Sequence, residues 1–133
     1  MSREIKSIDT VFVVKDISVP TVEWKQSFTL INDPTEVQVS QITFSDENTQ
    51  NHPAPPTSFI ISNLVIEPNN ILFSFIPTAT NISTNIIHRL ASSLENVEFK
   101  LQTFKNDAFQ DYNEQDIDIT GTLSFCLTFI EYV

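Results

Sequence analysis

The last stretch of the chain, Gly121–Val133, constrains the fold more than any other part of the sequence. Large apolar residues recur there at every second position, and further apolar residues fill several of the positions between them. The first set is Leu123, Phe125, Leu127 and Phe129, and the second is Cys126, Ile130 and Tyr132. Successive side chains of a strand point to opposite faces, so a segment that is apolar on both faces indicates a strand enclosed within a packed pair of sheets.

Alternating apolar and polar residues elsewhere predict further short strands, joined by turns that use Asn, Asp and Pro in place of glycine. The predicted strands are Thr10–Val14, Thr21–Ile31, Glu36–Phe44, Ser58–Ile66, Asn70–Ile76, Asn85–Leu94, Val97–Leu101 and Gly121–Val133.

Two of these strands carry a further prediction. The inward positions change parity across Ser40-Gln41, and a shift by one residue would turn every later side chain to the other face, so we expect a β-bulge or a bend in the strand there. Asn85–Leu94 has both a helical and a strand-like apolar pattern. Because its neighbours are all β, we favour a strand running into a loop, with a helical turn around Ala91–Glu95 as the alternative.

These elements predict one all-β domain over residues 1–133: a two-sheet antiparallel β-sandwich, with a single jelly roll of about eight strands as the leading topology. An immunoglobulin-like sandwich is the alternative. Residues 1–9 are expected to be an N-terminal arm or a short edge piece. Two polar segments, Ser45–Thr57 and Asn106–Asp118, are expected to be long loops.

Charge and glycine content exclude several function classes. The net charge is −10, and no Lys or Arg lies between Lys25 and Arg89, which disfavours nucleic-acid binding and adhesion to anionic membranes. The only glycine, Gly121, cannot build a phosphate-binding loop, a dinucleotide fingerprint or a nucleophile elbow. No apolar run is long enough to cross a bilayer, and the N-terminal residues lack the apolar core of a secretory signal.

Residues able to do chemistry are few and scattered, so we predict no catalytic residues, no cofactor and no enzymatic activity. His52 lies in a Pro-rich loop, and His88 is expected to be a partly buried structural residue. Cys126 fits a small core residue. Glu98 and Glu131 are the carboxylates to consider for a glycosidase pair, and their simpler interpretation is solvated charges on strands. The single tryptophan, Trp24, is expected in the core.

The most acidic stretch, Asn106–Asp118, is expected to be a hydrated loop, and its carboxylates are the best candidates for a metal site. Oxygen ligands from one loop can bind calcium, although the spacing does not match an EF-hand because no glycine stands at its turn. The candidate residues are Asp107, Asp111, Glu114, Asp116 and Asp118.

Three segments resemble small virion structural proteins with a jelly-roll fold, of the minor capsid, penton or spike type of DNA viruses. They are EVQVSQITF (Glu36–Phe44), SFIISNLVI (Ser58–Ile66) and GTLSFCLTFIEYV (Gly121–Val133). The resemblance covers about a third of the chain. It implies a non-enzymatic assembly unit, made in the host cytoplasm and located in the virion, which forms homo-oligomers or docks on other virion proteins. The alternative is a soluble β-sandwich module that binds carbohydrate or peptide through its loops.

Overall fold

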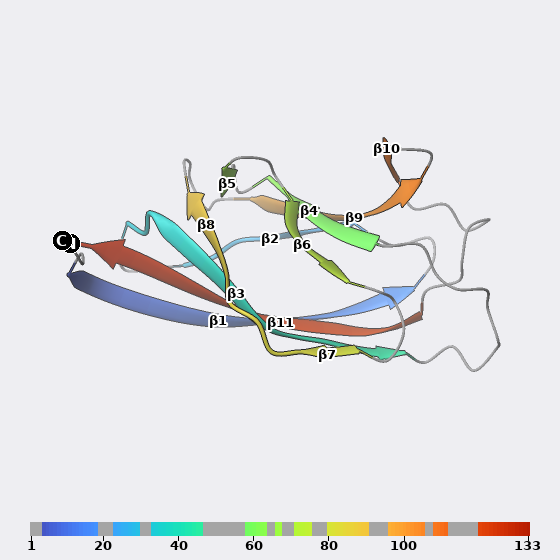
Figure 1. Cartoon of the computed structure of the whole chain (residues 1–133), viewed down its shortest axis with the longest axis horizontal. Helices are drawn as coiled ribbons and strands as arrows, with labels where there is room; N and C mark the ends of the chain where they lie inside the picture. The colour runs from blue at the N-terminus through green and yellow to red at the C-terminus, as the bar shows by residue number, and fades with distance from the viewer. Residues whose placement is uncertain are drawn as a thin grey trace.

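The computed structural model describes residues 4–18, 23–29, 33–46, 58–63, 66–67, 71–75, 80–90, 96–105, 108–111 and 120–133. These residues form eleven strands in two antiparallel sheets that lie as layers over one another (Figure 1). The predicted all-β sandwich is therefore confirmed.

The first sheet, sheet A, has the order β1-β11-β3-β8-β5, with β7 beside β3. Its strands are β1 (Ile5–Ser18), β3 (Glu36–Asp46), β5 (Ile66–Glu67), β7 (Thr80–Ile82), β8 (Ile86–Leu90) and β11 (Thr120–Tyr132). The second sheet, sheet B, has the order β10-β9-β4-β6, with β2 beside β9. Its strands are β2 (Glu23–Gln26), β4 (Ser58–Ser62), β6 (Ile71–Phe75), β9 (Val97–Lys105) and β10 (Ala108–Asp111).

Eight of these strands pair as a jelly roll. The first strand pairs with the last (β1 with β11), and the following pairs are β2 with β9, β3 with β8, and β4 with β6. That is the pairing of one long hairpin, and rolling it up places β11 beside β3 and β9 beside β4. The predicted jelly-roll topology follows from this strand order.

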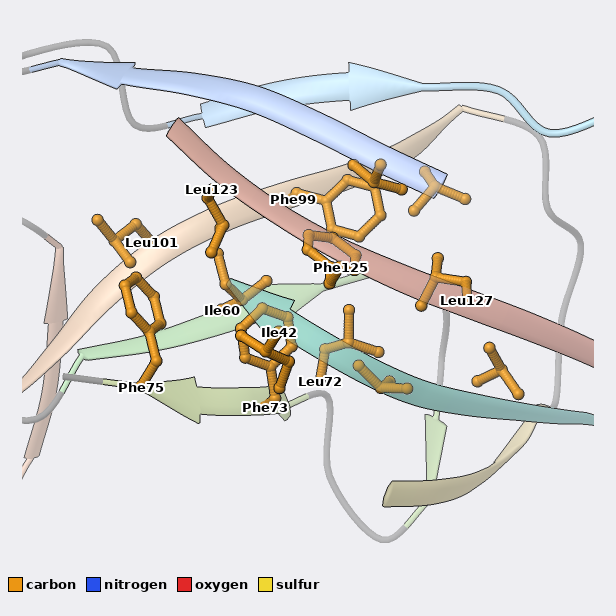
Figure 2. Close-up of a cluster of buried hydrophobic side chains, with 14 of the residues drawn as sticks. Ile42, Ile60, Leu72, Phe73, Phe75, Phe99, Leu101, Leu123, Phe125 and Leu127 are labelled. Carbon is orange, nitrogen blue, oxygen red and sulfur yellow. The ribbon is translucent and has the colours of Figure 1, made fainter. Parts of the chain in front are cut away.

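The core lies between the two sheets and is rich in phenylalanine. Phe125 of β11 contacts Phe99 of β9 and Phe73 of β6, with ring centroids 6.0 and 5.0 Å apart (Figure 2). Trp24 stacks on Phe99 at 4.9 Å, which agrees with its predicted place against the core. These edge-on and stacked arrangements are the ones aromatic rings prefer.

The local predictions met different outcomes. The bulge is confirmed: the β3–β11 register shifts between Ser40 and Thr43, and Gln41 has φ 54°. The strand interpretation of 86–90 is also confirmed, and 91–95 lie outside the described residues. Residues 5–9, for which an arm or an edge piece was expected, begin β1.

Other boundaries were wrong. The strand predicted over Thr21–Ile31 is shorter, because β2 ends at Gln26. The predicted Ser58–Ile66 strand is divided: Ser58–Ser62 pairs in sheet B, whereas Ile66–Glu67 pairs with β8 in sheet A. In addition, β10 falls in Asn106–Asp118, which was expected to be a loop, and β7 falls where no strand was predicted. Strand pairing satisfies backbone groups whatever the side chains are, so polar segments can join a sheet edge.

Candidate interaction surface

An open strand edge with exposed apolar side chains is the most unusual feature of the surface. β1 pairs with β11 along its full length and with no other strand in the described part of the chain. Val13 and Ile17 point into the core, whereas Ile8, Phe12 and Val14 are 52, 65 and 66 % exposed. We call these last three residues the β1 strip. A large exposed apolar group on a sheet edge marks an interaction site or an aggregation risk.

Two residues of the β1 strip lie opposite buried apolar residues of β11. In the β1–β11 register, Phe12 lies opposite Cys126 and Ile8 lies opposite Ile130. Cys126 and Ile130 are only 5 and 3 % exposed although they occupy the outer face of sheet A. Directly opposed side chains on one face are close enough to pack, so we expect Phe12 and Ile8 to cover this part of β11.

Two buried polar atoms near the same edge have no hydrogen-bond partner within the described residues: Asp9 Oδ2 on β1 and Trp24 Nε1 on β2. The ammonium of Lys15, on β1, lies 5.8 Å from the centre of the Trp24 ring. A buried polar atom without a partner costs free energy, so each is a position at which an added partner would be stabilising.

A hollow of about 480 Å³ lies beside β8, two strands away from β11 in sheet A. Its lining combines charged and apolar groups: Thr35, Glu36, Ile87, Arg89 and Leu90. Tyr132 donates a hydrogen bond of 2.8 Å to the Glu36 carboxylate. This volume is within the range of small-molecule sites.

At the end of β11, Glu131 links three parts of the chain. Its carboxylate accepts a 2.6 Å hydrogen bond from the Asp33 backbone N–H and lies 3.1 Å from the Lys6 ammonium. These contacts lower the pKa of the Glu131 carboxyl, the Asp33 hydrogen bond more than the Lys6 contact. Glu131 thus ties the start of β1 to the end of β11.

The two carboxylates considered for a glycosidase pair lie on different sheets. Glu98 lies on the outer side of β9 beside the buried Val97 and Phe99, and its backbone is bonded to Asn63. Glu131 belongs to the other sheet. His88 Nε2 is 2.8 Å from the carbonyl oxygen of Leu72 and so connects the two sheets, in keeping with the structural role predicted for it. His52 lies outside the described residues.

The acidic candidates for calcium cannot be placed. Asp107, Glu114, Asp116 and Asp118 lie outside the described residues, and only the backbone of Asp111 is described, at the end of β10. Among the described residues, no three His, Cys, Asp or Glu side chains gather as metal ligands would. The same part of the chain contains no helix that could span a bilayer.

Sequence reasoning missed the β1 strip. A signal was present, because TVFVV is apolar at adjacent positions on both sides of Phe12. The same pattern in Gly121–Val133 marks a strand buried on both faces, so the pattern alone cannot identify an edge strand. Comparisons with protein families, with characterised proteins and with solved structures find no match to this chain.

Proposed function

We propose that this chain is a non-enzymatic structural protein of a virus particle, which self-assembles or docks on other virion proteins. The observation that carries the proposal is the β1 strip, three large apolar side chains exposed on a strand edge of the jelly roll with which no other described strand pairs. An assembly protein needs an apolar surface that another chain covers, and the net charge of −10 limits association through the rest of the surface.

The described chemical groups give this proposal further support. The Glu98 and Glu131 carboxylates belong to different sheets, and the His88 ring is already bonded to a backbone carbonyl. Self-assembly or docking on other proteins requires none of these side chains to be catalytic.

The test has two parts: the chain is detected in virus particles, and a substitution in the β1 strip is then used to prevent its incorporation. Mass spectrometry of purified particles from a culture that carries the gene should detect the chain in stoichiometric amount. Phe12→Lys should lower its incorporation, because a charge replaces an apolar contact. Ile87→Lys is the matched control, since Ile87 is 55 % exposed on the same sheet but lies on β8. Absence of the chain from particles would contradict the proposal.

The second candidate is a carbohydrate- or peptide-binding module, and the hollow beside β8 favours it. Its lining offers a carboxylate and a guanidinium beside two apolar side chains, a mixture suited to a polar ligand with one apolar face. A glycan and peptide array separates the two candidates. Binding that is lost in Ile87→Lys and kept in Phe12→Lys would favour the module.

A further inference from the structure

We propose that two copies of this chain pair antiparallel through β1, about a twofold axis beside Phe12, so that sheet A continues from one copy into the other. The inference rests on the proposed assembly function for its biological setting and names the contact that such a function would use. The second copy is favoured over other occupants because the β1 edge is complementary to itself.

The free edge of β1 is long and regular. β1 has 14 residues and contains no proline. Its register with β11 is unbroken from Ser7 to Ser18, and the only irregularity lies between Ile5 and Ser7. A long regular edge presents a row of backbone donors and acceptors that a second strand can pair with. β1 carries four charged residues: Lys6 and Asp16 point outward, and Asp9 and Lys15, which have opposite signs, point inward.

The charges select one register. The inner faces of the two copies lie on the same side of the joined sheet only in every second register, because alternate side chains point to opposite faces. A pairing centred on Phe12 places Asp9 opposite Lys15 of the second copy, and Lys15 opposite Asp9 of the second copy. The same pairing places Val11 opposite Val13 and joins the two Phe12 side chains on the outer face. Opposite charges at directly opposed positions are favourable.

The neighbouring registers lack this match. A pairing centred on Val11 would place Lys6 opposite Asp16 of the second copy, but both residues already have partners within their own copy. Lys6 lies 3.1 Å from Glu131, and Asp16 accepts a 2.9 Å hydrogen bond from Thr122. That register would also leave Asp9 opposite Val13. Centred on Val13, Asp9 would oppose Ile17.

The selected register also supplies the missing partner. Asp9 Oδ2 is buried and unbonded within the described residues, and the Lys15 ammonium of the second copy would lie opposite it. Within one copy, Lys15 lies over the ring of Trp24. Trp24 Nε1 is the other buried polar atom without a hydrogen-bond partner among the described residues. The pairing therefore brings the Asp9 carboxylate of one copy toward Trp24 of the other copy, whose Nε1 has no acceptor within the described residues.

Charge exchange tests the pairing in the full-length chain. Analytical ultracentrifugation should show a concentration-dependent dimer. Asp9→Lys places two lysines opposite each other, and Lys15→Asp places two aspartates opposite each other. Each change should therefore weaken dimerisation on the order of a hundredfold. An equal mixture of the two variants restores both charge pairs and should form a heterodimer, and the double variant should form a homodimer again.

A cross-link tests the register. Phe12→Cys is made in a Cys126→Ala background, because Cys126 lies opposite Phe12 within one copy. Directly opposed residues of antiparallel strands have Cα atoms about 4.5–5.5 Å apart, so the Phe12→Cys chain should form an intermolecular disulfide on mild oxidation. Thr10→Cys in the same background is the control and should not cross-link, because Thr10 would oppose Val14.

Circular dichroism establishes that each variant is folded. Formation of the heterodimer on mixing is a second control, because unfolded chains could not pair. A wild-type chain that stays monomeric at the highest concentration would overturn the pairing. A dimer that tolerates both single charge changes would also overturn it, as would cross-linking through Val11→Cys in place of Phe12→Cys. If the chain is found in particles, the proposed function stands whichever of these results is obtained. A chain that forms the register-specific dimer but is absent from particles would refute the proposed function and leave the pairing intact.

Discussion

β1 and β11 pair over nearly their whole length, yet they meet opposite environments. β11 lies between two strands, and even its outward residues Cys126 and Ile130 are only 5 and 3 % exposed. Among the described strands β1 has a neighbour on one side only, and its outward residues Ile8 and Phe12 are 52 and 65 % exposed. Both strands are rich in apolar residues, so the comparison shows that position in the sheet, more than the local sequence, decides which apolar residues are covered.

The sharpest way to test this comparison is to shorten one phenylalanine in each strand. Phe125→Ala leaves a cavity among the rings of Phe73 and Phe99, so it should reduce the free energy of unfolding by about 3–5 kcal/mol. Phe12→Ala removes an exposed ring and should change it by about 0.5 kcal/mol or less in the monomer. Urea unfolding of dilute protein measures both. Equal losses for the two variants would show that β1 is not exposed as described.

A second test concerns the close approach of β11 to β3. A Cβ added at Gly121 would overlap the backbone carbonyl oxygen of Ser45 and lie 2.9 Å from Phe44 Cζ. Gly121→Ala should therefore destabilise the chain by about 1–3 kcal/mol, because the strands must separate. Thermal unfolding followed by circular dichroism measures the change. Ser124→Ala, elsewhere on β11, is the control and should have little effect; a stable Gly121→Ala chain would show that the two strands are farther apart.

The coupling between the two strands is measurable where Phe12 lies opposite Cys126. If Phe12 covers Cys126, the effects of Phe12→Ala and Cys126→Ala should not add. A double-mutant cycle should give an interaction of about 0.2–1 kcal/mol, the range for cross-strand pairs. Thr10 with Cys126 is the matched diagonal pair and should couple more weakly. Complete additivity for Phe12 and Cys126 would mean that another group buries the thiol.

The smallest expected effect lies where the two strands are tied together by Glu131. Its pKa is lowered in the folded chain, so its contribution to stability is complete above the ordinary carboxyl pKa and is lost as the pH falls through the folded value. Glu131→Gln should be slightly less stable than the wild type at neutral pH and equal to it in acid. Unfolding curves at several pH values provide the measurement, and a difference that grows in acid would contradict the assignment.

Much of the fold could be predicted from local pattern. Leu123, Phe125, Leu127 and Phe129 were assigned to one buried face because their spacing leaves no other arrangement in a strand. The bulge near Gln41 followed from a change of parity. The division of Ser58–Ile66 between two sheets, and the strands β7 and β10, could not be predicted, because backbone pairing can include polar residues when a partner edge is near.

The candidate surface depended on tertiary structure even more. The sequence alone determined that TVFVV is a strand and that its alternate residues face opposite sides. Only the folded chain decided that this strand lies at an edge, which exposes Phe12 and leaves Asp9 and Lys15 beside an open row of backbone groups. The physical reason is that hydrogen bonds between strands join backbones, which are alike in every residue but proline. A strand's own sequence therefore determines its faces, whereas the rest of the chain determines its neighbours.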